Sequence, residues 1–143
     1  MTELELQAQV ADYLRLQYPD VLFHSDFGSG IKLTKGQAVK QKRLQGGRRA
    51  WPDMFIAEPR RNKINGKQYH GAFLELKRDG VKVFRKDGLV VADKHIREQF
   101  YMIDDLIRKG YFADFACGFD EAKKIIDGYL RPNKEGVENG KTQ

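Results

Sequence analysis

The sequence predicts one α/β domain whose mixed central β-sheet is flanked by helices. Its 143 residues suit one ordinary domain and are too few for two well-packed cores. Segments with helical spacing and with strand-like composition alternate along the chain, which favours a sheet covered by helices. We assign residues 1–130 to this domain and expect the polar residues 131–143, which lack an apolar anchor, to form a disordered tail.

The N-terminal segment has the features of a helix followed by a strand. Thr2 is a suitable N-cap, and Glu5 three residues later completes a capping box. Apolar residues then recur at helical spacing, at Leu6, Val10, Tyr13 and Leu14. We expect the helix to end near Gln17, and the apolar and aromatic residues 21–27 to form a strand.

The rest of the chain predicts two hairpins, then helix, strand and helix. Residues 54–57 and 72–76 should pair antiparallel across a polar link that contains the turn signal Asn65-Gly66. Residues 81–84 and 89–91 suggest a smaller hairpin. Asp93 can cap a helix that ends at Gly110. Residues 112–117 are expected to form a further strand of the sheet, and residues 119–130 a closing helix. The inward face of the helix after Asp93 is predicted at Ile96, Phe100, Ile103 and Ile107.

Cysteine and apolar content exclude several classes of protein. The single cysteine, Cys117, cannot form an internal disulfide, and we expect it in the core. The three histidines show no zinc-site spacing with it. No apolar stretch approaches the ~20 residues of a bilayer span, and the N-terminus lacks an apolar signal region. We therefore expect a cytoplasmic protein without a membrane partner.

The positive charge is concentrated in one segment. The net charge is +6, yet residues 28–49 hold seven basic residues and no acidic one, while the remaining 19 basic residues are balanced by 20 acidic ones. Such a segment suits a polyanion such as nucleic acid, although a solvated basic loop has the same composition. Because it is long for a structureless connection, it is either functional or partly helical around residues 37–44.

Three charged residues of the first predicted hairpin carry candidate chemistry. Strand alternation places Glu75 and Lys77 on one face and their neighbours Leu74 and Leu76 in the core, and the antiparallel partner brings Asp53 alongside. Two converging carboxylates repel each other unless a cation lies between them, and hard oxygen ligands favour Mg2+ or Mn2+. A lysine there can orient water or neutralise charge on a phosphate, which is phosphodiester hydrolysis chemistry.

The Glu-X-Lys pattern occurs twice, and the second copy serves as a control. Glu121-Ala122-Lys123 falls in the predicted last helix, where residues two apart point in nearly opposite directions and cannot converge on one ligand. For Glu75 and Lys77 the alternative is an exposed ion pair with Asp53 on a surface strand. The preceding Pro-Asp and the basic segment favour the site.

With Pro52-Asp53 and Glu75-Leu76-Lys77 as its signature, the sequence resembles the PD-(D/E)XK superfamily, and specifically the VRR-NUC family. The resemblance covers nearly the whole chain and includes the approach to Asp53 over residues 46–51 and Gln99 in the following helix. It implies a restriction-endonuclease-like fold with Mg2+ or Mn2+ held by Asp53, Glu75 and the Leu76 carbonyl, completed by Lys77 and Gln99. Small members are typical of phages and bacteria, which implies a role in DNA repair or recombination in the bacterial cytoplasm.

Two residues that would support the site, Gln99 and an acid of the first helix, can each be interpreted in two ways. Gln99 turns an amide toward the buried side of its helix, where it either holds water or Lys77 or lies at the edge of the apolar stripe. An acid at the start of the first helix is also implied; Glu3 is in line with the inward face, whereas Glu5 has the capping role available. We favour Glu3. His24 and His95 are expected to be structural, with an approach to the substrate as the alternative.

Together these observations predict a metal-dependent DNA endonuclease selective for a junction, flap or nick. The alternative is a non-catalytic DNA-binding module with a nuclease-like fold; an RNA-binding protein fits less well because the aromatics are not interleaved with basic residues. A symmetric junction would require a homodimer. The residues predicted to bind DNA phosphates are Lys32, Lys35, Lys40, Lys42, Arg43, Arg48 and Arg49.

Overall fold

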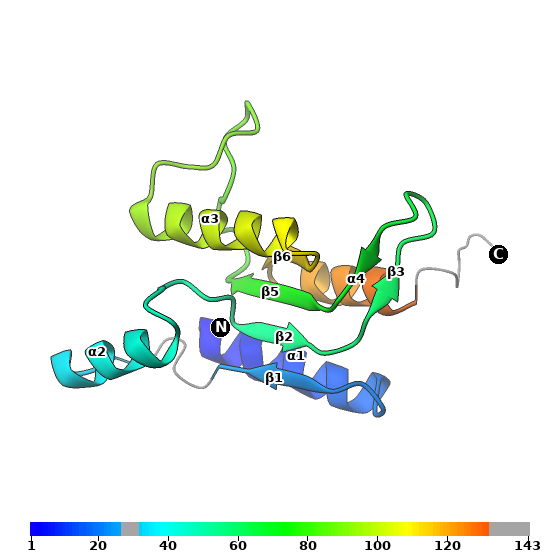
Figure 1. Ribbon diagram of the computed structural model, residues 1–143, viewed down its shortest axis with the longest axis horizontal. Coiled ribbons are helices and arrows are strands. Elements are labelled where there is room, and N and C mark those ends of the chain that lie inside the picture. Colours follow the sequence, from blue (N-terminus) through cyan, green and yellow to red (C-terminus); the bar gives the residue numbers. More distant parts are fainter. Residues whose placement is uncertain (27–31, 132–143) are drawn as a thin grey trace.

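The structure, a computed structural model, describes residues 1–26 and 32–131, and its main elements follow the predicted order (Figure 1). The elements are α1 (Glu3–Gln17), β1 (Phe23–Ser25), α2 (Lys35–Leu44), β2 (Met54–Ile56), β3 (Arg60–Arg61), β4 (Gln68–Tyr69), β5 (Ala72–Lys77), α3 (Lys94–Arg108), β6 (Phe112–Cys117) and α4 (Phe119–Leu130). Apart from Arg131, the predicted tail lies outside the described residues, as does the end of the predicted first strand.

The central sheet is mixed and has the strand order β1-β2-β5-β6. β2 pairs antiparallel with both β1 and β5, as expected for the predicted hairpin, and β5 pairs parallel with β6. The parallel pair is joined through α3, because parallel neighbours require a crossover rather than a tight turn. β1 and β6 are therefore the two edges of this sheet.

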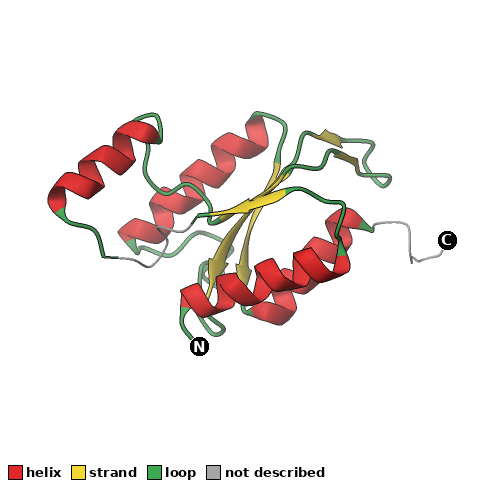
Figure 2. Cartoon of the chain, turned by 90° about the horizontal axis from the view of Figure 1, so that it is seen from below, coloured by secondary structure: helices red, strands yellow, loops and turns green. Residues whose placement is uncertain are grey.

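Helices cover both faces of the sheet (Figure 2). α1 and α4 pack on one face around a core that includes Leu6, Val10, Leu74, Leu76 and Ile126. α3 packs on the other face, where its buried residues meet aromatic side chains of the strands. The predicted α/β architecture, a mixed sheet flanked by helices, is confirmed.

Local capping signals explain where the helices begin. Thr2 and Glu5 form the predicted reciprocal capping box of α1, and Asp93 accepts a hydrogen bond from the Ile96 backbone nitrogen at the start of α3. A second capping box, made by Thr34 and Gln37, begins α2 within the basic segment. The predicted helical part of that segment is thus confirmed and begins two residues earlier than expected.

Several predicted details are wrong in their extent. β1 begins at Phe23, two residues later than predicted, and spans Phe23–Ser25. The predicted hairpin over residues 81–91 is reduced to one bridge, between Phe84 and Val90. The Asn65-Gly66 turn closes the separate hairpin of β3 and β4 rather than joining β2 to β5 directly. Cys117, expected in the core, is half-buried at the end of β6.

The buried face of α3 is rotated from the predicted one. Ile103 is buried as expected, but Gln99, Met102 and Leu106 complete the face, while the other predicted apolar residues are half-buried at its margin. α3 carries apolar residues around a wide arc, so the sequence alone leaves the exact orientation of the helix open.

Candidate active site

The end of β5 brings the three predicted chemical residues together. Glu75 and Lys77 lie on the α3 face of the sheet, while Leu74 and Leu76 point into the core beneath α1 and α4. Met54 is paired with Leu74, so continuing the antiparallel register by one residue places Asp53 opposite Glu75. Strand alternation and register therefore bring Asp53, Glu75 and Lys77 together at the end of β5.

All three side chains are buried. Asp53 is 8% exposed, Glu75 3% and Lys77 5%. The Lys77 ammonium nitrogen lies 3.9 Å from Glu75 Oε2, and Asp53 Oδ2 accepts a hydrogen bond of 2.8 Å from the Leu76 backbone nitrogen. The alternative of an exposed ion pair on a surface strand is therefore wrong.

The pKa of the Glu75 carboxyl is raised well above its ordinary value. Burial is the largest cause, because it disfavours the charged form; the neighbouring Asp53 acts in the same direction through its charge and a side-chain hydrogen bond. The ammonium group of Lys77 opposes this effect, and Glu3 adds a smaller repulsion. Without a cation, ionisation of Glu75 is thus unfavourable at this position.

The Pro-Asp dipeptide also changes the hydrogen bonding of β5. The Leu76 N–H points toward β2 and donates a hydrogen bond to the Asp53 carboxylate. In a strand, the carbonyl of a residue points to the same side as its N–H, so the Leu76 carbonyl also points toward β2. Continuing the register by two residues places Pro52 opposite Leu76. Because proline has no N–H, this position of the ladder supplies no donor to the Leu76 carbonyl.

The first helix separates the two candidate acids. Glu5 is exposed and engaged in the capping box with Thr2, where these hydrogen bonds lower the pKa of its carboxyl. Glu3 is half-buried and close enough to Glu75 to raise its pKa. The structure thus places Glu3 beside the acid pair, as the periodicity predicted.

Sequence reasoning missed Gln7, which lies one turn after Glu3 and is 4% exposed. Its amide nitrogen donates to Ser25 Oγ at 2.9 Å and to the Asp26 carbonyl at 2.8 Å. The Asp26 backbone nitrogen in turn donates to the Asp53 carbonyl at 2.8 Å. Gln7 therefore fixes the strand end behind Asp53; its spacing of three and seven residues from Val10 and Leu14 was an available signal.

Gln99 is buried in α3, with 5% of its side chain exposed. Its Nε2 lies 3.2 Å from Nε2 of the exposed His95, one turn earlier on α3. Within the described residues, Gln99 Oε1 is the one buried side-chain oxygen or nitrogen without a hydrogen-bond partner. His24 is exposed on β1.

α2, within the basic segment, projects from the end of the molecule at which β5 ends and β2 begins (Figure 1). α2 has no buried residue, and all seven predicted phosphate-binding side chains belong to exposed residues. The connection from α2 to Asp53 is anchored by two contacts: Trp51 Nε1 donates to the Gln45 carbonyl at 3.1 Å, and Arg48 forms an ion pair of 3.2 Å with Asp105 of α3.

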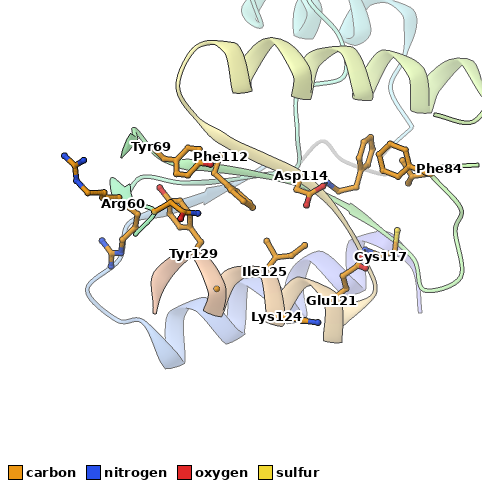
Figure 3. A pocket seen from close by; sticks show the side chains of 15 residues that line it. Arg60, Tyr69, Phe84, Phe112, Asp114, Cys117, Glu121, Lys124, Ile125 and Tyr129 are labelled. Atoms are coloured by element: carbon orange, nitrogen blue, oxygen red, sulfur yellow. Dashed lines mark hydrogen bonds between the residues drawn. The ribbon is translucent and has the colours of Figure 1, made fainter. Parts of the chain in front are cut away.

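Two hollows flank the outer strand β6. A groove of about 730 Å³ runs between β6 and α4, with Phe112, Asp114, Ile125 and Tyr129 along it, and contains none of the predicted catalytic residues (Figure 3). A second cavity, of about 860 Å³, is lined by residues 78–81 directly after Lys77 and by the start of α4. Asp53, Glu75 and Lys77 line neither hollow.

The described parts of the chain contain neither a three-residue metal cluster of His, Cys, Asp or Glu nor a membrane-spanning helix. Over residues 1–26 and 32–131, no group of three or more His, Cys, Asp or Glu side chains is arranged to hold a metal ion. Over the same residues, no helix is long and apolar enough to cross a membrane.

The sheet, its covering helices and the buried acid and lysine cluster define a nuclease-like domain of the restriction-endonuclease-like class. A solved structure described as a VRR_NUC domain protein is similar to this chain, with a TM-score of 0.61, coverage of 92% of this chain and 89% of the other, and 25% sequence identity. No model of a protein family and no curated protein matches the sequence. The predicted resemblance to VRR-NUC proteins is thereby confirmed. This likeness supports a nuclease-like domain.

Proposed function

We propose that this protein is a Mg2+- or Mn2+-dependent DNA endonuclease formed by residues 1–130. The buried cluster of Asp53, Glu75 and Lys77 at the end of β5 is the observation that supports the proposal most. A fold has no structural need for two adjacent buried carboxylates and one lysine, since burying such charges is costly. Their retention in one place is explained by the reaction they serve.

The residues present fit a hydrated divalent cation. Asp53 and Glu75 offer two carboxylates, and the Leu76 carbonyl lies on the same side of β5 as its N–H, which Asp53 accepts. Mg2+ commonly keeps several waters and is held by one or two carboxylates, so a cluster of three acids is unnecessary. When bound, the cation would activate water and stabilise the charge that develops on the phosphate.

The remaining residues of the site prepare water and substrate. The Lys77 ammonium, buried beside Glu75, is placed to orient water or neutralise charge on a phosphate oxygen. The Gln99 oxygen is an acceptor for the attacking water, and Glu3 contributes further negative charge beside Glu75. Catalysis is thus assigned to Asp53, Glu75, Lys77 and Gln99, with Glu3 in support.

The basic segment supplies affinity for the DNA backbone. Its seven exposed basic residues have no acidic neighbour in sequence, and α2 is a capped helix without contact to the core. Junction, flap and nicked DNA all present duplex next to the cleaved phosphate, and we propose such structures as substrates in DNA repair or recombination. Two copies would be needed for a symmetric junction.

The decisive experiment separates cutting from binding. Asp53→Asn and Glu75→Gln should each abolish Mg2+-dependent cleavage of labelled junction, flap, nicked and plain duplex DNA. Binding without metal should be retained or slightly tighter, because each neutral side chain removes repulsion of the phosphates. Full cleavage by either variant, or a wild-type protein that binds these DNAs but cuts none with Mg2+ or Mn2+, would support a non-catalytic module instead.

A salt titration tests the basic segment. If Lys40, Lys42 and Arg43 contact three phosphates, replacing all three by alanine should make the log-log salt dependence shallower by about 2.7, at roughly 0.9 per phosphate. The matched control replaces Lys63, Lys67 and Lys109, which are exposed elsewhere on the surface. An unchanged slope in the first variant would remove α2 from the interface.

A further inference from the structure

His95 and Gln99 form a contact that the proposed mechanism does not yet use. They occupy successive turns of α3, whose first residues lie at the end of the molecule where β5 ends (Figure 1). Gln99 is buried beside Met102 and Ile103, on the side of α3 that packs against the sheet face carrying Glu75 and Lys77. His95, one turn earlier on the same helix, is exposed.

The geometry of the contact defines which atoms donate and accept. The Gln99 amide nitrogen always carries hydrogens, so its 3.2 Å approach to His95 Nε2 is a hydrogen bond only if that ring nitrogen has no proton. The ring is then neutral, with its proton on Nδ1. With the amide nitrogen turned to His95, the amide oxygen is turned away from it into the interior.

That oxygen is the one buried side-chain polar atom without a partner in the described ranges. An unsatisfied buried acceptor is costly, and native structures rarely retain one without a functional reason. Turning the amide over would direct its oxygen to His95 and its nitrogen to the interior. The acceptor on His95 therefore decides which end of the amide faces the interior.

We infer that His95 is a positioning residue, which holds the Gln99 amide so that its oxygen accepts a hydrogen bond from the attacking water. This inference rests on the proposed nuclease function and adds a residue to it. His95 itself touches neither the phosphate nor the acid pair; it acts through Gln99.

The tautomer of His95 provides a test that needs no substrate. Nitrogen-15 NMR of the neutral imidazole should show the proton on Nδ1, whereas an exposed ring ordinarily favours the proton on Nε2. In Gln99→Leu, which removes the donor, His95 should return to the ordinary form, and the exposed His24 provides an internal reference. A proton on Nε2 in the wild type, or a tautomer unaffected by Gln99→Leu, would overturn the inference.

Cleavage kinetics test whether the contact affects the reaction. At saturating Mg2+ and DNA, His95→Ala and Gln99→Ala should each slow single-turnover cleavage by about ten-fold, as expected for one hydrogen bond to a reacting group. The double variant should be no slower than Gln99→Ala alone, because His95 acts through Gln99. His95→Gln, whose oxygen can replace the ring nitrogen as acceptor, should restore most of the rate.

Two results would contradict the assignment. Losses that multiply in the double variant, or weaker DNA binding by His95→Ala with an unchanged rate at saturation, would show a direct phosphate contact instead. If the wild type cuts no DNA, the nuclease proposal fails, but the tautomer still reports whether His95 orients Gln99. The two failures are therefore distinguishable.

Discussion

The same pattern, Glu-X-Lys, occurs on β5 and on α4, and the two copies behave differently. On β5, Glu75 and Lys77 lie on one face of the strand, buried and 3.9 Å apart. On α4, Glu121 accepts a hydrogen bond from the Cys117 backbone nitrogen, while Lys123 forms an ion pair with Asp127 one turn later. Backbone geometry, not residue identity, makes one copy a candidate site and the other part of a helix surface.

The backbone between the charged residues differs as well. On α4, the carbonyl of Ala122 can accept the helical hydrogen bond from the backbone N–H four residues later. Opposite Leu76 of β5, the continued register places a proline, which has no N–H to donate. The strand copy thus combines two carboxylates, a lysine and a carbonyl without a ladder donor. In the helical copy the glutamate and the lysine have separate partners and do not meet each other.

The largest expected difference between the two copies is the effect on the cleavage rate when the lysine of each is replaced. Lys77→Met should lower the single-turnover rate of Mg2+-dependent cleavage by about 10²- to 10⁴-fold, the usual contribution of a group that transfers or orients a proton. Mn2+ binding, measured by titration calorimetry, should persist because the carboxylates remain. Methionine fills the same buried space without the charge.

Lys123→Met is the matched control, since Lys123 contacts Asp127 and the Tyr13 ring on the opposite side of the sheet. It should leave the cleavage rate within about two-fold of the wild type. Equal effects of the two variants would show that the strand copy has no special role.

The second prediction concerns the two glutamates of α1. Glu3→Ala should lower the cleavage rate by about ten-fold, as for residues that support a metal site from outside it. Glu5→Ala should leave the rate unchanged and cost roughly 1 kcal/mol of folding stability, because it removes half of the capping box. Loss of cleavage in Glu5→Ala at full stability, with Glu3→Ala active, would reverse the assignment.

The sequence predicted the elements whose signals are local. The capping box of α1 and the turn before β6 mark boundaries that the structure confirms, and strand alternation was sufficient to place Glu75 and Lys77 together. Two carboxylates and a lysine on one strand pair were sufficient to propose a candidate site. These features depend on neighbours in sequence or on a simple register.

What escaped prediction depends on contacts between distant segments. Gln7 gains its role from the end of β1, and the orientation of the Gln99 amide depends on His95 and on how α3 lies against the sheet. The rotation of α3 itself is decided by packing, since several of its faces are apolar. Sequence periodicity can place a side chain such as Gln7 on the buried face of its helix, but it gives neither the partner of that side chain nor the orientation of an amide.

The third prediction tests the proline opposite Leu76. Pro52→Ala introduces an N–H that can donate to the Leu76 carbonyl and compete with a cation for it. We expect Mn2+ affinity to fall by about five- to ten-fold, equivalent to one hydrogen bond. Pro59→Ala, in the link after β2, controls for the general effect of removing a proline. Equal metal affinities in both variants would exclude the carbonyl as a ligand.

The smallest expected effect is on stability and compares Glu75→Gln with Glu121→Gln. Because the pKa of Glu75 is raised in the folded state, the folded protein holds that proton more tightly than the unfolded chain does. Folding stability that is present below the pKa of Glu75 in the unfolded chain is then lost as the pH rises toward the pKa of Glu75 in the folded protein. The amide introduced in Glu75→Gln does not ionise, so this variant does not lose stability in this way.

In metal-free buffer, urea unfolding between pH 5 and 9 should therefore show Glu75→Gln gaining stability over the wild type as pH rises, by about 1 kcal/mol or more at the alkaline end. Glu121→Gln, which also removes one negative charge but from an exposed helix position, controls for net charge. Saturating Mg2+ should abolish the difference, because a bound cation compensates the ionised Glu75. Parallel wild-type and Glu75→Gln curves without metal would mean that burial and Asp53 impose no cost on the Glu75 charge, and the electrostatic case for a cation at this site would fail.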